Sequence, residues 1–184
     1  LLATCVALLT ALVVVWALRL ARARRKPALE TASVRLASLG YAVPGTVLAL
    51  GLLVPLAAFD AGLSRALSLF GIAPQLWLMG SMAALVIAYT LRFLTIAIGN
   101  VEAGLERIPT SMDDAARSLG STASATLRQV HLPLLRPALA AAALLVFIDV
   151  MKELPATLLL RPLGFDTLAT WLYADAARGA YEEG

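Results

Sequence analysis

The 184-residue sequence is poor in charge and nearly lacks the residues that build disulfides and metal sites. Only 15% of its residues are charged, whereas 60% are hydrophobic. A soluble domain carries about a quarter charged and about half apolar residues, so this composition excludes a soluble enzyme and a disordered chain. A single cysteine, Cys5, excludes an internal disulfide, and a single histidine, His131, excludes a histidine metal cluster.

The sequence also lacks the signatures of nucleotide hydrolysis and of common catalytic centres. Neither of its lysines, Lys26 and Lys152, follows a glycine, so the phosphate-binding pattern G-x-x-x-x-G-K-[ST] is missing. The patterns H-E-x-x-H, C-x-x-C and G-x-S-x-G are missing as well. We therefore expect a protein that is not an enzyme and needs neither a cofactor nor a metal ion. Any ATP hydrolysis is expected to be carried out by a partner.

Long apolar runs dominate what is present. We place four of them at about residues 1–18, 36–58, 76–99 and 138–160. Each is long enough as a helix to cross about 30 Å of hydrocarbon. The runs are continuous rather than alternating, which favours helices over the strands of a barrel. The sequence therefore predicts an all-α, polytopic bundle of transmembrane helices, forming a single domain over residues 1–184.

Both ends of the chain suggest that it is part of a longer protein. Leu1 already lies within an apolar run, and no closing apolar run precedes Gly184. No basic segment precedes the first run and no cleavage signature follows it, so we do not expect a signal peptide. We interpret the chain as the C-terminal part of a longer membrane protein, itself cut short.

The basic residues gather on alternate loops. Residues 19–35 hold six basic side chains against the single acid Glu30, and residues 100–137 hold four arginines. The segment 59–74 and the tail from Arg161 show no such excess. Because basic loops stay in the cytoplasm, we expect 19–35 and 100–137 to face the cytoplasm at a bacterial inner membrane. Topology and contact with membrane lipid then explain the net charge of +3, and no nucleic-acid partner is expected.

Residues 100–137 are too long for a simple connector and carry the signals of a short helix. Thr110 or Ser111 can cap a helix over Met112–Leu119 by accepting its first free N–H groups. Gly120 is free to adopt a positive φ and is expected to end that helix.

A second short helix is expected directly after this corner. Ser121 or Thr122 can cap a helix over Ala123–Val130, and Leu132-Pro133 is expected to end it. Residues 100–137 would then form a helical hairpin that projects into the cytoplasm, with small residues at its corner that let another protein approach closely.

This hairpin resembles the EAA loop of ABC-importer permeases. The family pattern is Glu-Ala-Ala, three residues, Gly, nine residues, Ile, one residue and Leu-Pro. The chain has the full spacing, with Asp in place of Glu and Val in place of Ile, at Asp114, Ala115, Ala116, Gly120, Val130, Leu132 and Pro133. The resemblance implies the MetI-like fold of type I importers. It also implies that these residues, together with Ser121, form a surface that couples the membrane helices to separate ATPase subunits.

Other segments are similar to the permeases for ferric iron, namely Arg92–Leu94, Glu102–Leu105, Asp149–Thr157 and Phe165–Thr170. This resemblance implies ferric iron as cargo, a periplasmic ferric-binding protein as partner, and a further permease half. The EAA loop does not separate iron from thiamine, sulfate, molybdate or polyamine, so these cargoes remain alternatives. A non-ABC membrane carrier or a membrane enzyme would need a coupling-ion site or a catalytic constellation, and neither is evident.

Three charged residues lie inside the fourth apolar run. Asp149, Lys152 and Glu153 share one helix face by their spacing, and charges at membrane depth require a partner or a water-filled cavity. Pro155 removes a helical hydrogen bond just beyond them, and interrupted helices with charges are typical of transport sites. We expect Asp149, Lys152, Glu153 and Pro155 to line the translocation path or its gate. A structural ion-pair network is the alternative.

Two further polar residues receive structural interpretations. Arg92 lies near the cytoplasmic end of the third run, where a long basic side chain is expected to reach the membrane interface. His131 falls within the hairpin and is expected to be a surface or docking residue.

Overall fold

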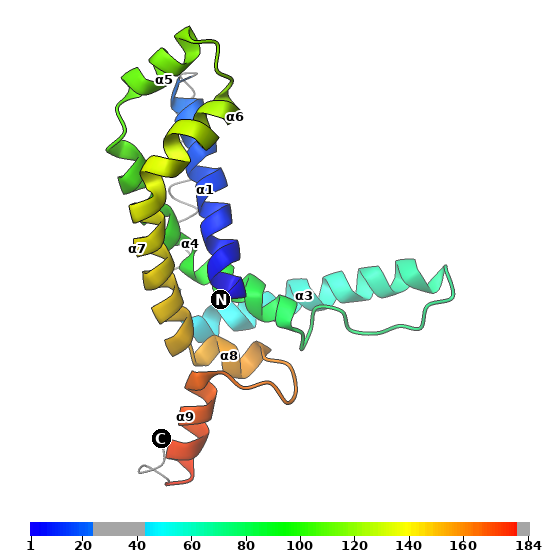
Figure 1. Cartoon of the computed structure of the whole chain (residues 1–184). Helices are drawn as coiled ribbons and strands as arrows, with labels where there is room; N and C mark the ends of the chain where they lie inside the picture. Colours follow the sequence, from blue (N-terminus) through cyan, green and yellow to red (C-terminus); the bar gives the residue numbers. More distant parts are fainter. Residues whose placement is uncertain (24–42, 180–184) are drawn as a thin grey trace.

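The computed structural model describes residues 1–23 and 43–179, and all regular structure in these ranges is helical (Figure 1). In chain order the elements are α1 (Leu2–Ala23), α3 (Gly45–Ser68), α4 (Met82–Glu106), α5 (Thr110–Ser118), α6 (Ala123–Thr126), the π-helical turn η1 (Leu127–His131), α7 (Leu132–Lys152), α8 (Pro155–Leu160) and α9 (Leu168–Ala177). The prediction of an all-α chain is confirmed. The basic segment 24–35 and the expected start of the second apolar run at 36–42 lie outside the described residues.

Four helical stretches of the described chain have the length and hydropathy of membrane spans. They are Leu2–Arg22, Gly45–Ser68, Met82–Glu106 and Ala123–Lys152. They correspond to the four apolar runs of the sequence, although their ends differ from the expected ones.

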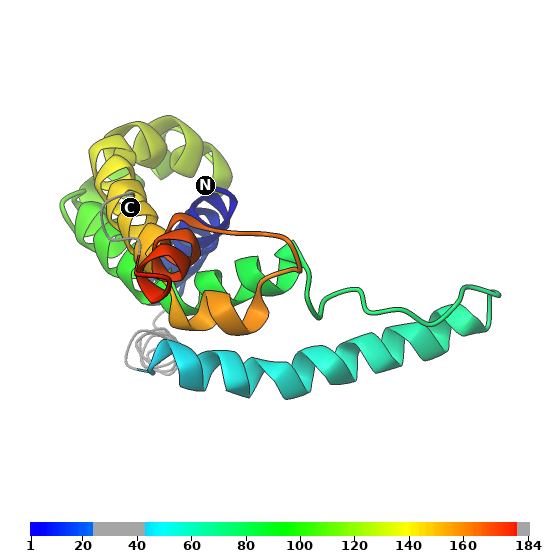
Figure 2. The ribbon, with the colours of Figure 1, turned by 90° about the horizontal axis from the view of Figure 1, so that it is seen from below.

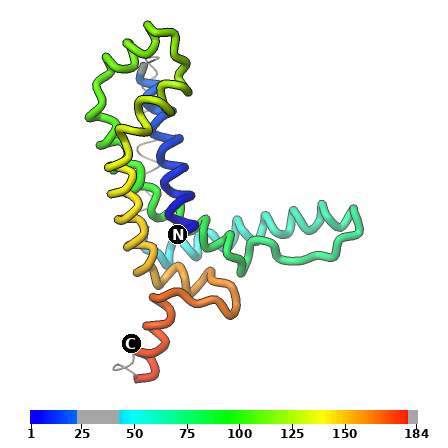
Figure 3. Tube along the Cα trace, in the orientation of Figure 1, coloured from blue at the N-terminus to red at the C-terminus, as the bar shows by residue number. Residues whose placement is uncertain are grey.

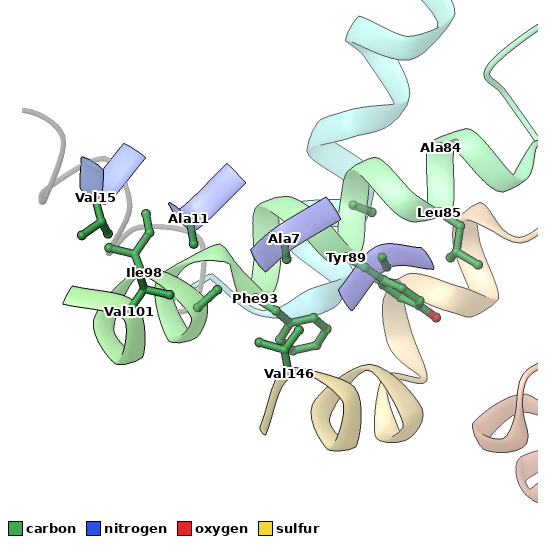
Figure 4. Packing of buried hydrophobic residues seen from close by; sticks show 14 of the residues in the cluster. Ala7, Ala11, Val15, Ala84, Leu85, Tyr89, Phe93, Ile98, Val101 and Val146 are labelled. Carbon is green, nitrogen blue, oxygen red and sulfur yellow. The ribbon is translucent and has the colours of Figure 1, made fainter. Parts of the chain in front are cut away.

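α1, α4 and α7 pack against one another and enclose the apolar core (Figures 1 and 4). On α1 four of the buried residues recur every four positions, at Ala3, Ala7, Ala11 and Val15. This spacing places them in one stripe on one face of the helix. Small side chains let helix backbones approach closely, which is how helices gain packing energy in lipid.

α3 leaves this bundle and points away from it (Figures 1 and 2). Its first half packs beside α8, where Gly45, Ala49 and Leu56 are buried. Much of its remaining surface is apolar and exposed, as at Val54, which is 75% exposed. Within the described residues α3 therefore presents apolar surface that requires lipid or another protein to cover it.

The expected loop at 59–74 is wrong in its bounds, because α3 continues to Ser68. Asp60 is an acidic residue within the apolar sequence of α3, and backbone groups outside the helix bind it. Its carboxylate accepts backbone N–H groups from Trp77 at 3.1 Å, Leu78 at 2.8 Å and Met79 at 2.8 Å. An ionised carboxylate can accept all three hydrogen bonds, so the buried Asp60 holds α3 against the segment that leads into α4.

α4 begins and ends later than the expected third run at 76–99. Ser81 starts the helix at Met82 because its hydroxyl accepts the N–H groups of Ala83 and Ala84. The helix then continues to Glu106. Arg92 consequently lies in the middle of the helix rather than near its end.

The expectation that Leu132-Pro133 ends a helix is also wrong. α6, η1 and α7 form one continuous helix from Ala123 to Lys152, which Figure 3 follows as an uninterrupted coil. The Leu132 N–H donates to the Leu127 carbonyl, five residues back, so the turn before Pro133 is wider than an α-turn. We attribute the continuity to this wide turn, because a proline in a regular helix clashes with the carbonyl four residues before it.

Candidate functional site

α5 and α6 form a hairpin at the end of the bundle where α1 and α4 finish (Figure 1). α5 starts at Thr110, and its N-cap is Pro109, with no side-chain cap. The expected capping role of Thr110 or Ser111 is therefore wrong. Pro109 has a φ of −65°, the value to which its ring restricts it, and it needs no N–H partner at this position.

The hairpin turns at the expected residue. Gly120 has a φ of +78°, and Ser121 N–H donates to the carbonyl of Ala116 at 2.9 Å. Thr122 then caps α6 by accepting the N–H of Ala125 at 3.3 Å. The predicted corner at Gly120 and the predicted cap at Thr122 are both confirmed.

The residues of the expected coupling surface divide between two faces of the hairpin. Asp114 and Ala115 are exposed, and so is the corner, where Leu119 is 86% exposed. Asp114 forms a 2.6 Å ion pair with Arg117 that leaves the two side chains 69% and 65% exposed. Ala116, in contrast, is buried. The exposed part of the first helix therefore offers one carboxylate, paired with Arg117, beside small and apolar side chains.

The second half of the expected surface follows the continuous helix into α7. Ser121 and Val130 are half-buried, whereas Leu132 and Pro133 are exposed. Asp114, Ala115 and the corner are thus the exposed part of the expected surface on the first half of the hairpin.

His131 is fully buried, so its expected place at the surface is wrong. Its Nε2 lies 2.6 Å from Asp113 Oδ1. A carboxylate only accepts hydrogen bonds, so Nε2 is the donor in this contact. The ring of Trp16 meets the His131 ring edge to face, with centroids 4.8 Å apart. The burial arises because the wide turn η1 faces α1, a contact that the local sequence does not reveal.

The second candidate region is the interruption between α7 and α8, which confirms the expected helix break. α7 ends at Lys152, Glu153 has extended backbone angles, and Pro155 starts α8. Glu153 is only 6% exposed. Its Oε1 accepts the N–H of Ala156 at 3.2 Å, so the carboxylate caps the new helix.

Arg92 completes the surroundings of Glu153 from the middle of α4, not from near the end of a helix as the sequence predicts. Arg92 Nε donates to Glu153 Oε2 at 2.8 Å, and a terminal nitrogen donates to the carbonyl of Val43 at 2.8 Å. The physical reason is the position of Arg92 in mid-helix, from which the side chain reaches the break. Sequence reasoning did not find this pair.

Asp149 and Lys152 form a separate ion pair at 3.0 Å. Lys152 is 67% exposed and Asp149 is 27% exposed. Both line a cavity of about 330 Å³ together with Arg92, Phe93 and Glu153. Among the described residues, no group of three or more His, Cys, Asp or Glu side chains is placed to hold a metal ion. The cavity thus has two basic and two acidic side chains, each engaged in a pair.

Comparison with known proteins matches this chain to a family. The family described as "Binding-protein-dependent transport system inner membrane component" matches residues 7–177. The Fe(3+)-transport system permease protein FbpB 2 of Haemophilus influenzae is 34% identical over 148 residues, covering 79% of this chain and 26% of that protein. The putative 2-aminoethylphosphonate transport system permease protein PhnV of Salmonella typhimurium is 31% identical over 143 residues, covering 78% and 48%.

A further relative is the trehalose transport system permease protein SugB of Mycobacterium tuberculosis. It is 32% identical over 111 residues, covering 60% of this chain and 40% of that protein. The chain thus spans about a quarter to a half of the length of these curated relatives.

Proposed function

The chain belongs to the family of inner-membrane components of binding-protein-dependent transport systems, and we propose that it forms part of the translocation path of an ATP-driven importer of ferric iron. The observation that carries the proposal is the exposed hairpin corner around Asp114, Ala115 and Gly120, at one end of a bundle of apolar helices. The family and the fold agree with the resemblance drawn from the EAA pattern. The chain is a transport component, and the hydrolysis of ATP is assigned to a separate subunit.

In this proposal the hairpin is the contact with the ATPase. Residues 100–137 would form the cytoplasmic coupling loop of a single permease domain, with Asp114, Ala115 and Gly120 at its outer face. The 2.6 Å pair between Asp114 and Arg117 is highly exposed. Such a pair contributes at most about 1 kcal/mol, so Asp114 can exchange it for a basic group of a partner at little cost.

The charged break between α7 and α8 would take two different roles in transport. Asp149 and Lys152 line the 330 Å³ cavity and are partly exposed, which suits a path that cargo touches only briefly. Glu153 and Pro155 lie at the point where the helix is interrupted, which suits a gate. The alternative, a purely structural ion-pair network, fits the buried pair of Glu153 with Arg92 better than it fits the exposed Lys152.

Topology and partners follow from the same arrangement. The described end of α1 and the hairpin lie together, because Arg19 of α1 pairs with Asp113 of α5 at 2.8 Å. This is consistent with cytoplasmic positions for residues 19–23, the described part of the basic segment, and for the hairpin. A periplasmic binding protein would then deliver cargo at the opposite side. A further permease half and membrane lipid would cover the apolar surface of α3.

The nature of the cargo is the finer part of the proposal. Ferric iron is supported by the segments similar to ferric permeases and by the relative FbpB 2. The carboxylate of Asp149, which lines the cavity and is partly exposed, is a hard oxygen donor that suits ferric iron in transient contact. A second candidate is 2-aminoethylphosphonate, supported by the relative PhnV. That molecule carries an ammonium and a phosphonate, which matches a cavity lined by both signs of charge.

Uptake into proteoliposomes tests the function and the cargo together. The assembled transporter would be reconstituted with its ATPase and binding protein, and ATP-driven entry of radioactive ferric iron would be measured. We expect saturable uptake that unlabelled ferric iron blocks and that 2-aminoethylphosphonate does not. Uptake of the phosphonate but not of iron would replace the iron assignment. If ATP is still hydrolysed and neither compound enters, both cargoes are contradicted.

A further inference from the structure

Asp113, the residue before Asp114, lies at the junction of four helical elements. Its Oδ2 accepts Arg19 Nε of α1 at 2.9 Å, and a second Arg19 nitrogen lies 2.8 Å from the same oxygen. Its Oδ1 pairs with His131 Nε2 of η1 at 2.6 Å. Arg19 also donates to the carbonyls of Leu105 at 2.9 Å and Ile108 at 3.1 Å, at the end of α4. One carboxylate and one guanidinium therefore connect α1, α4, α5 and η1.

The two neighbouring acids of α5 point to different surroundings. Asp113 is 20% exposed, and its partners Arg19 and His131 are 13% and 0% exposed. Asp114 is 69% exposed and bonds Arg117 of its own helix. Shielded, charge-assisted hydrogen bonds are stronger than exposed ones. Asp113 is therefore held within the protein, whereas Asp114 remains available to a partner.

The contact between α5 and α1 depends on this polar cluster more than on close packing. Within the described ranges, two cavities of about 540 Å³ and 240 Å³ lie beside it, and both are lined by Arg19 and Asp113. Cavities remove the dispersion contacts that otherwise fix one helix against another. Among the described residues, the bonds between Asp113 and Arg19 are therefore the direct polar connection through which a displacement of α5 can reach α1.

We propose that Asp113, Arg19 and His131 are positioning residues that transmit movement of the hairpin to α1 and α7, while Asp114 and the corner make the contact with the ATPase. This inference rests on the proposed function. It predicts that docking and transmission can be separated by substitutions at adjacent positions. Loss of the Asp113 carboxylate leaves the outer face of the hairpin in place but disconnects it from the membrane helices.

The test compares Asp113→Asn with Asp114→Asn in the assembled transporter. Capture of the ATPase, ATP hydrolysis and cargo uptake are measured on the same proteoliposomes. We expect Asp113→Asn to capture the ATPase as the unaltered protein does, and to hydrolyse at least about fivefold more ATP per cargo molecule, the lower range of coupling between linked sites. Asp114→Asn is expected to lower capture and to leave the ATP-to-cargo ratio of the remaining complexes unchanged.

Three further variants serve as controls for a misfolded Asp113→Asn protein and separate transmission from stability. Arg19→Lys keeps the charge but loses the planar fork that bonds Asp113 and the α4 carbonyls together, and we expect it to raise the ratio too. His131→Gln retains an N–H donor for Asp113, so we expect a smaller increase than with His131→Leu. This graded rescue appears in the ATP-to-cargo ratio, which a general loss of stability does not change.

The outcomes distinguish this inference from the function on which it rests. If Asp113→Asn and Arg19→Lys keep the normal ratio while capturing the ATPase, the inference is overturned and the proposed function stands. If both lose capture to the same extent as Asp114→Asn, the cluster belongs to the docking surface and the inference is again wrong. If the unaltered protein captures no ATPase, the proposed function fails and the inference fails with it.

Discussion

Arg92 and Glu153 connect the middle of α4 to the break between α7 and α8 through an ion pair of 2.8 Å. The same guanidinium bonds the carbonyl of Val43, immediately before α3. The same carboxylate caps α8 through the N–H of Ala156. The helices α3, α4, α7 and α8 therefore meet at one shielded pair of charges, and any movement of the break must strain or rearrange that pair.

Substitution of Glu153 by Gln is expected to destabilise the protein by about 3 kcal/mol, because it leaves Arg92 shielded from water without its counter-charge. Arg92→Gln together with Glu153→Gln is expected to recover part of this loss, since no charge then remains unpaired. Thermal unfolding in detergent provides the measurement. Lys152→Gln is the matched control, because its exposed pair with Asp149 contributes at most about 1 kcal/mol. An equal loss in the two single variants would contradict this account of Glu153.

Gly45 provides a steric test of the same junction. An added Cβ at Gly45 would lie 2.5 Å from Glu153 Oε1 and 3.2 Å from Arg92 Cζ. Gly45→Ala is therefore expected to displace the pair and to lower stability by about 1–3 kcal/mol, the usual cost of overpacking. Gly51→Ala in the same helix meets nothing within 4 Å and is expected to be neutral or slightly stabilising. If both variants unfold at the same temperature, α3 does not approach the pair as closely as described.

The contact between α4 and α7 is tested by a second pair of glycines. An added Cβ at Gly104 would lie 2.5 Å from Ala138 Cβ and 3.1 Å from Leu135 Cδ2. Since these atoms belong to a packed neighbouring helix, we expect Gly104→Ala to cost about 1–3 kcal/mol. Gly99→Ala, also on α4, has open space around it and serves as the control for helix propensity. Unfolding of both variants in detergent measures the difference, and its absence would contradict the close packing of α4 on α7.

The corner of the hairpin is tested by backbone strain alone. Gly120 has a φ of +78°, and an added Cβ would meet nothing within 4 Å. Gly120→Ala is expected to cost about 1–2 kcal/mol, because an alanine is strained in this conformation, and to reduce ATP-driven uptake by altering the turn. Gly164→Ala, with a φ of +75° in equally open space before α9, carries the same strain far from the hairpin. We expect it to leave the ATPase contact intact, so equal losses of ATPase capture would contradict a special role for the corner.

The local features of the fold could be predicted from the sequence. Apolar runs predicted four helical spans, the glycine at 120 predicted the corner, and Pro155 predicted the break. These features depend on the conformational preferences of one or a few neighbouring residues. The ends of the helices were less predictable. Asp60 receives partners 17 to 19 positions away that only the folded chain supplies, whereas the cap at Ser81 is local but lies inside an apolar run.

The partners of the charged residues could not be predicted. Arg92 is 61 positions from Glu153, and Asp113 is 94 positions from Arg19. No periodicity relates such positions, since they meet only when separate helices pack together. His131 was expected at the surface because it lies within the loop segment 100–137. The wide turn η1 instead lets the helix continue and carries the ring into the protein.

Cysteine crosslinking from the hairpin tests the central claim most directly. Asp114→Cys and Ser121→Cys would each be introduced into the assembled transporter in membranes and treated with a short bifunctional reagent. Leu163→Cys, which is fully exposed in the α8–α9 segment, serves as the control for accessibility. We expect positions 114 and 121 to crosslink to the nucleotide-hydrolysing subunit while position 163 does not. Failure of both hairpin positions to capture that subunit, with position 163 reacting normally with soluble reagent, would contradict the account.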